Sequence, residues 1–269
     1  MKFRSIILLA FAILLIGSCK SEFEKIRASG DPKMVLAKAN AYYANEDYQK
    51  AQTLYELVIA SYRGQIEAED IYYKYAYTYY HLEQYILASY YFNTFIRTYS
   101  TSDRKEEVSF MSAYCNYQMS PTYRLDQTYT EKAIDEFQTF INTYPQSDRV
   151  SESNDLIDEM RKKLEIKAFE EGKLYYDIKR YEASIQSFEN LLKEFPETIA
   201  AEEVRFLIAN AAYLLASNSF VEKQEKRYTL AVAKANNYTE TFPTGTNNLR
   251  IKEIVIKSKE RLKELENIK

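Results

Sequence analysis

Tyr48-Gln-Lys-Ala-Gln-Thr-Leu-Tyr-Glu-Leu-Val-Ile-Ala-Ser-Tyr62 is the stretch whose spacing recurs along the chain. Its small residue, Ala51, follows an aromatic residue by three positions and precedes large apolar residues by four, seven and eleven. Steps of three and four place these side chains on one face of a helix. Four later stretches keep the spacing around Ala88, Ala133, Ser184 and Ala231. The chain is therefore a repeat of one helical unit.

Each unit ends in an aromatic residue, and in the last three units this residue is followed by Pro145, Pro196 or Pro243. Proline ends a helix because it lacks the amide donor and restricts the residue before it. A second stripe lies upstream of the first, with Ala39 three residues before Tyr42 in the first unit. The small residue lets a second helix approach closely, and the aromatic residue fills the space beside it. Each unit is expected to be an antiparallel pair, helix A then helix B.

This order of small and aromatic residues resembles the tetratricopeptide repeat, whose period is about 34 residues. The closing aromatic residues are 37, 45, 51 and 47 positions apart, so the units are longer. We expect the extra residues in loops, at 120–127 and at 217–226. The predicted fold class is all-α, an α-solenoid of about five tetratricopeptide-like helix pairs with a C-terminal capping helix. A docking helix for a partner is the alternative for that last segment, whose apolar stripe is Ile251, Val255, Leu262 and Leu265.

The N-terminus has the pattern of a secretory signal, a basic start followed by an apolar run at residues 6–16. The run is shorter than the roughly 20 residues that span a membrane. Ile16-Gly-Ser-Cys19 resembles a bacterial lipobox, which implies cleavage before Cys19 and covalent lipid on that residue, with no other cofactor. Lys20 replaces the aspartate that retains enterobacterial lipoproteins in the inner membrane, which favours the outer membrane. We divide the chain into a signal peptide (1–18), a lipidated tether (19–30), repeats 1–3 (31–145), and repeats 4–5 with the last helix (146–269).

The composition argues against several functions. A net charge of -3 with mixed signs does not favour a nucleic-acid binder, which would carry a clustered basic surface. With one histidine, His81, the sequence offers no nucleophile–base set, metal-ligand cluster or phosphate loop, so we do not expect an enzyme or a metal site. Cys115 is the one cysteine besides Cys19, and its helical position favours a buried apolar role. A binding protein without catalysis is the expected class.

Tyrosine is abundant, with 26 tyrosines and 14 phenylalanines but no tryptophan. Most of these residues fit the packing stripes, but a subset lies on the adjacent face of the A helices, which lines the concave groove in tetratricopeptide-like proteins. Tyrosine combines a large contact area with a hydroxyl group for a peptide backbone. The candidate groove residues are Asn40, Tyr43, Tyr73, Tyr77, Tyr80, Tyr114, Tyr117, Lys173 and Tyr176.

The lipobox, the stretched repeats and the inserted segment at 120–127 together resemble the BamD (also called YfiO) family of outer-membrane lipoproteins, particularly its Bacteroidetes form. The resemblance covers the whole chain. It implies a lipid-anchored scaffold on the outer membrane, facing the periplasm, within the β-barrel assembly machine. Its partners would be a BamA-like barrel subunit, held by the C-terminal repeats, and unfolded outer-membrane protein clients. Ser187 stands where the enterobacterial protein has a charged contact residue, so no partner-contact residue is carried over.

Two other classes remain open from the sequence. A SusD-type glycan-binding lipoprotein is also helical and lipidated, but it is about twice as long and uses tryptophan against sugars. The second is a cell-envelope repeat scaffold unrelated to barrel assembly.

Overall fold

The computed structural model describes residues 21–267, and its chain forms two compact units. Of the described residues, unit 1 contains 21–120 and 128–157, and unit 2 contains 121–127 and 158–267. Every regular element in this part of the chain is a helix, which confirms the all-α prediction. The predicted signal peptide and Cys19 lie outside the described residues.

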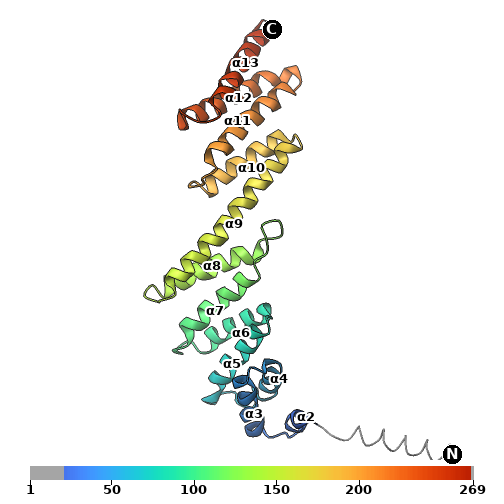
Figure 1. The fold of residues 1–269 in the computed structure, drawn as a ribbon, viewed down its shortest axis with the longest axis vertical. Coiled ribbons are helices and arrows are strands. Elements are labelled where there is room, and N and C mark those ends of the chain that lie inside the picture. Colours follow the sequence, from blue (N-terminus) through green and yellow to red (C-terminus); the bar gives the residue numbers. More distant parts are fainter. Residues whose placement is uncertain (1–20, 268–269) are drawn as a thin grey trace, which may run out of the picture. The chain divides into compact units, whose positions relative to one another are not determined.

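Unit 1 consists of a short leading helix and three helix pairs stacked in chain order (Figure 1). The leading helix is α2 (Glu22–Arg27). The pairs are α3 (Pro32–Ala44) with α4 (Tyr48–Val58), α5 (Glu67–His81) with α6 (Tyr85–Thr98), and α7 (Lys105–Gln118) with α8 (Thr128–Thr143). The next helix, α9 (Val150–Asp177), begins in this unit.

Unit 2 contains the remainder of α9 and four further helices. They are α10 (Tyr181–Glu194), α11 (Ala201–Ser217), α12 (Val221–Thr241) and α13 (Asn248–Glu266). Ile251 and Ile254 of α13 are fully buried against Ala209, Ala235 and Tyr238 of the preceding pair. The five helix pairs are thus confirmed, and the C-terminal helix packs on the last of them.

Local signals in the sequence begin and end these helices. The Asp31 carboxylate accepts a hydrogen bond from the amide of Lys33 at 3.0 Å, and Pro32 occupies the first turn of α3. The chain reverses between helices A and B through a single left-handed residue in three of the pairs. These residues are Glu46, Glu83 and Lys179, with φ of 60°, 56° and 61°. One residue in the left-handed conformation is enough to end a helix and redirect the chain, so the turns at these three positions are short.

The repeated small and aromatic residues form the core between helices A and B. The five anchors around which the repeats were aligned, Ala51 through Ala231, are all fully buried. The aromatic residues four positions after them are also fully buried in four of the units: Tyr55, Phe92, Phe137 and Phe188. The stripe of small and aromatic residues from which the helices were predicted is therefore buried in the core between helices A and B.

Two local expectations were wrong. Residues 22–27 of the expected tether form α2, where Ile26 is buried and the Phe23 ring lies 5.9 Å from that of Tyr42. The fifth unit has no ten-residue loop at 217–226, because only residues 218–220 separate α11 from α12 and the other extra residues lengthen α12. The loop expected at 120–127 is present between α7 and α8.

Gly172 of α9 provides a test of the close helix contact. A β-carbon at this position would lie 2.6 Å from ring atoms of the fully buried Phe188. Alanine favours a helix over glycine by about 1 kcal/mol, but overpacking costs about 1–3 kcal/mol. We expect Gly172→Ala to lower the free energy of unfolding in urea. In a Phe188→Leu background the same change should cost nothing, and an equal loss in both backgrounds would contradict the steric explanation.

Candidate peptide-binding face

The candidate site in unit 1 is the side on which successive A helices contact one another, which we call the A-helix face. It is formed by α3, α5 and α7. At its centre two tyrosine hydroxyl groups of α5 donate to one carboxylate oxygen of Glu107 on α7, at 3.0 Å from Tyr73 and 2.6 Å from Tyr77. Their rings lie 4.8 Å apart. Burial, and secondarily the bond to Glu107, raises the pKa of both hydroxyls, so they remain protonated donors.

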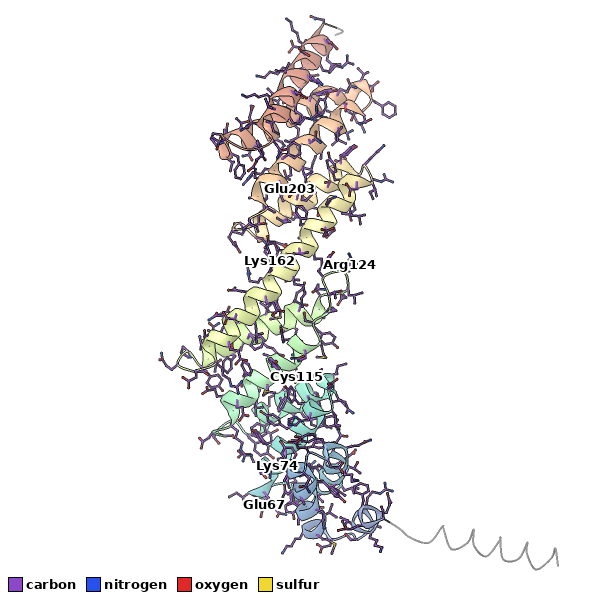
Figure 2. The ribbon with its side chains drawn as sticks, in the orientation of Figure 1. Glu67, Lys74, Cys115, Arg124, Lys162 and Glu203 are labelled. Carbon is purple, nitrogen blue, oxygen red and sulfur yellow. The ribbon has the colours of Figure 1, made fainter. Side chains whose placement is uncertain are left out.

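Charged side chains connect the same three helices. Asp70 of α5 forms ion pairs with Arg104, at 3.0 Å, and with Lys74, at 2.6 Å. Lys74, labelled in Figure 2, also donates to the side-chain oxygen of Asn40 on α3 at 3.1 Å. The Arg104 guanidinium lies 4.4 Å from the centre of the Tyr73 ring. The two cations hold the pKa of Asp70 below its usual range against the opposing effect of burial.

These contacts follow a rule that the sequence analysis missed. Their partners stand 34 residues apart: Asn40 with Lys74, Asp70 with Arg104, and Tyr73 with Glu107. Thirty-four residues is the tetratricopeptide period, so equivalent faces of successive A helices meet in this register. A search for complementary polar residues at this separation could have found Asp70, Lys74, Arg104 and Glu107. The predicted groove residues were mostly aromatic and, apart from Asn40 and Lys173, included no polar partner of this kind.

An aromatic cluster extends the face toward the turns between helices A and B. His81 stacks on Tyr48 with ring centres 4.1 Å apart, and Tyr43 lies edge-on to both rings. Burial lowers the pKa of His81, which keeps the imidazole neutral at pH 7. Tyr77 makes a further edge contact with Phe92 of the core. His81 was set aside in the sequence analysis as the lone histidine, and here it belongs to the face.

The candidate tyrosines differ in what they offer to a ligand. Tyr77 is only 9% exposed and serves mainly to support the face. Tyr80 and Tyr114 are half-buried, with ring centres 6.4 Å apart, and Tyr117 lies 5.6 Å beyond Tyr114. Together with Tyr43 and Tyr73, which are also half-buried, these three rings form the accessible aromatic part of the A-helix face in unit 1. The structure therefore brings together all the candidate residues of α3, α5 and α7.

The remaining two candidates lie in unit 2, where a similar arrangement is present. The side-chain amide of Asn210 on α11 donates to the Tyr176 hydroxyl, again across 34 residues. The Asn210 oxygen accepts from Arg250 of α13 at 3.4 Å, and the Arg250 guanidinium lies 5.7 Å from the Tyr213 ring. Lys173 forms an ion pair within its own helix, with Asp177 at 3.1 Å. Unit 2 thus carries fewer aromatic residues on this face than unit 1.

Other features of the described residues bear on chemistry and location. Cys115, labelled in Figure 2, is fully buried as expected, and burial raises the pKa of its thiol to about 12. Residues 21–267 contain no group of three side chains able to hold a metal ion. In the same span, no helix is both long and apolar enough to cross a bilayer.

Stacked antiparallel helix pairs with an aromatic, hydrogen-bonded A-helix face define a helical-repeat protein of the tetratricopeptide kind. A family model described as YfiO, outer membrane lipoprotein, matches residues 29–227. The chain belongs to this family of outer-membrane lipoproteins. The matched residues include the whole A-helix face of unit 1, whereas α13 and most of α12 lie beyond them.

Comparisons with individual proteins give distant similarities. A tetratricopeptide-repeat protein of Bacteroides fragilis is 13% identical with a TM-score of 0.37, covering 86% of this chain and 98% of its own. A thermophilic tetratricopeptide-repeat protein of Thermus thermophilus is 15% identical with a TM-score of 0.32, covering 84% and 100%. The search among curated proteins returned no match.

The contribution of the two hydrogen bonds to Glu107 can be tested by measuring the stability of the protein. Tyr77→Phe removes the shorter hydrogen bond while keeping the ring, and a bond to a charged acceptor contributes about 1.5–3 kcal/mol. We expect a loss of this size in the free energy of unfolding of full-length protein. The matched control is Tyr90→Phe, because Tyr90 is 58% exposed. Equal stability of the two variants would show that the bond contributes nothing.

Proposed function

We propose that this protein is a non-catalytic lipoprotein scaffold of the β-barrel assembly machine, lipid-anchored through Cys19 and facing the periplasm. It binds a BamA-like barrel subunit and segments of unfolded outer-membrane proteins. The observation that carries the proposal is the match of residues 29–227 to a family of outer-membrane lipoproteins. We include in this proposal that the chain is of the Bacteroidetes type of the family.

The A-helix face of unit 1 suits client segments. Unfolded barrel strands alternate apolar and polar residues and expose their backbone. Tyr80, Tyr114 and Tyr117 offer apolar rings with hydroxyl groups at their edges, which fit both parts of such a strand. The bonds to Glu107 and Asp70 hold this surface in place before a ligand arrives, which reduces the ordering cost of binding.

The proposed binding site for the barrel subunit is at the C-terminal end of unit 2. A groove of about 390 Å³ runs between α12 and α13, and its lining includes Ile251, Val255 and Ile256. Ile256 lies beside the apolar stripe of α13 and is 56% exposed, whereas the residues of the stripe itself are buried or half-buried. An apolar groove at the end of a helical stack can take a helix or strand of a partner. The capping and docking roles considered for the last helix are compatible, since Ile254 is buried against the preceding pair while Ile256 of the same helix is exposed at the groove.

Affinity purification from detergent-solubilised envelopes tests the proposal. The lipidated chain should recover a large barrel protein with repeated periplasmic domains, identified by mass spectrometry. Ile256→Glu should reduce this recovery by about tenfold or more, because a charge would be buried in the groove. The control Ile199→Glu makes the same change at a residue that is 90% exposed in the same unit and outside the groove lining. Cys19→Ala controls for membrane attachment, and recovery of a nutrient transporter instead would reject the proposal.

Client binding is tested separately with a fluorescent peptide that has the sequence of a barrel strand. Loss of two interfacial tyrosines costs roughly 2 kcal/mol or more at a binding hot spot. Tyr80→Ala with Tyr114→Ala should therefore weaken binding at least about tenfold, as measured by anisotropy. Tyr129→Ala is the control, since Tyr129 is also half-buried but lies on a B helix. If all the variants bound the peptide equally, clients would have to bind elsewhere.

A further inference from the structure

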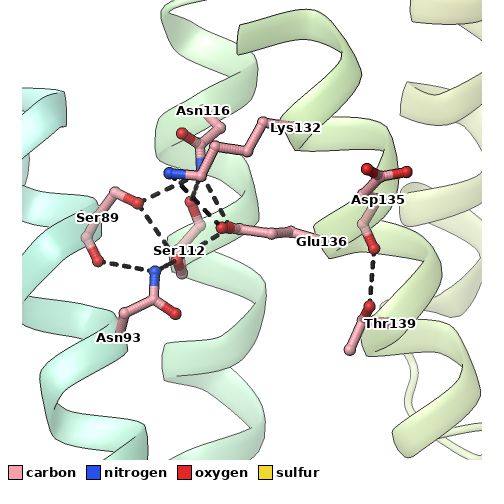
Figure 3. Close-up of polar contacts among 8 residues, drawn as sticks. All are labelled: Ser89, Asn93, Ser112, Asn116, Lys132, Asp135, Glu136 and Thr139. Carbon is pink, nitrogen blue, oxygen red and sulfur yellow. Dashed lines mark hydrogen bonds and ion pairs between the residues drawn. The ribbon is translucent and has the colours of Figure 1, made fainter. Parts of the chain in front are cut away.

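A second candidate binding site lies in unit 1, outside the A-helix face. A cavity of about 310 Å³ opens between α6, α7 and α8. Its apolar lining, which we call the apolar wall, consists of Ile96, Phe140 and Tyr144. Its polar lining includes Asn93, Ser112 and Glu136, drawn in Figure 3.

Glu136 is held by buried donors from α7. Its Oε2 atom accepts hydrogen bonds from the Ser112 hydroxyl at 3.0 Å and the Asn116 side-chain amide at 2.9 Å (Figure 3). Ser112 is 2% exposed and Asn116 is fully buried, so the carboxylate has a fixed orientation. The other oxygen, Oε1, has Lys132 at 3.9 Å, beyond a normal hydrogen bond. This oxygen therefore takes part in one long ion pair, which a stronger donor can replace.

The Asn, Ser and Thr side chains that also line the cavity direct their donors into the protein. The Asn93 amide donates to the Ser89 backbone oxygen at 3.1 Å and to the Ser112 hydroxyl at 2.6 Å. Each lining hydroxyl of the set Ser109, Thr139 and Thr143 donates to the backbone oxygen one turn earlier, at 2.7, 2.8 and 2.7 Å. Hydroxyl and amide oxygens keep unused lone pairs. Around Glu136 the cavity thus presents acceptors and negative charge.

The one cation that lines the cavity stands apart from this carboxylate. Lys105 precedes Ser112 on α7 by seven residues, which is roughly 10 Å along a helix. The Tyr144 ring packs against Phe140, with ring centres 5.4 Å apart, and so belongs to the apolar wall. The described cation that does pair with this carboxylate is Lys132, at 3.9 Å with a half-exposed side chain, and an arriving guanidinium would replace this long contact. Phe140 follows Glu136 by about one helical turn and places an aromatic ring at this end of the cavity.

We propose that this cavity receives an arginine side chain from a segment of a protein partner. A guanidinium carries five donors and no acceptor, pairs with a carboxylate, and packs flat against aromatic rings. Lysine would place a compact, strongly hydrated charge next to the apolar wall and fits less well. The cavity volume is at the lower end for ligand pockets and suits one long side chain with part of its backbone.

Exposed apolar residues on α6 indicate that the arginine is presented by a protein segment. Ile86, Tyr90 and Asn93 follow one another at steps of four and three, so they lie on one helical stripe that leads to the cavity. Ile86 is 62% exposed and Tyr90 is 58% exposed. A free arginine or polyamine would leave this stripe uncovered, whereas apolar residues flanking an arginine would bury it.

The test uses full-length protein and a blocked tripeptide, acetyl-Leu-Arg-Leu-amide, with binding followed by NMR at the side-chain amides of Asn93 and Asn116. Both signals should shift. The citrulline peptide, which has the same shape without the charge, should bind about tenfold or more weakly, because a charge-assisted hydrogen bond is lost. This comparison requires no variant of the protein, so it holds whether or not a substitution affects folding.

Variants then locate the carboxylate. Glu136→Gln should weaken arginine-peptide binding by about tenfold, while its amide oxygen can still accept from Ser112 and Asn116. Asp135→Asn removes the same charge from the neighbouring residue of α8, outside the cavity lining, and should leave binding unchanged. An equal loss of affinity in both variants would show that the effect is long-range charge alone and would overturn the proposal. Equal binding of the citrulline and arginine peptides would also overturn it. Equal binding of arginine amide and the tripeptide would overturn it too, because it would indicate a small-molecule site.

Discussion

The fold depends on the close approach of helix A to helix B, which small side chains permit at one level of every pair. Ala51, Ala88, Ala133, Ser184 and Ala231 are fully buried on the B helices. In the fourth pair the A helix contributes Gly172, whose backbone oxygen accepts from the Ser184 hydroxyl at 2.9 Å. Large aromatic side chains fill the space above and below this contact. Because the seam buries the apolar side of both helices, their outer faces are left to vary.

In unit 1, the A-helix face and the cavity between α6, α7 and α8 present different chemical groups. The A-helix face is stabilised by polar bonds between residues 34 apart, and it presents tyrosine rings with protonated hydroxyls. The cavity between α6, α7 and α8 turns its donors inward and presents a carboxylate. One surface suits an exposed peptide backbone and the other a cationic side chain. A scaffold with two chemically distinct surfaces could hold two different protein segments on one unit without competition between them.

Much of the fold was predictable because packing of helices follows a short sequence period. The stripe around Ala51 gave the five pairs and their buried aromatic residues. The sequence did not reveal that the extra residues of the fifth unit lengthen α12, because both a loop and a helix accommodate a polar run such as residues 221–226. Tyr73 and Tyr77 were among the predicted groove residues, whereas their common acceptor Glu107 was missed. Bonds such as theirs depend on the register between helices, and the register becomes visible only when residues 34 apart are compared.

Site-specific photo-crosslinking in living cells tests the central claim, that the A-helix face receives unfolded outer-membrane proteins, most directly. A photoreactive phenylalanine analogue would replace Tyr114 on that face or Tyr129 on a B helix, both half-buried in unit 1. The account predicts crosslinks to outer-membrane barrel precursors from position 114 and few or none from position 129. Equal crosslinking from both positions, or none from position 114 in a folded and lipidated protein, would contradict it.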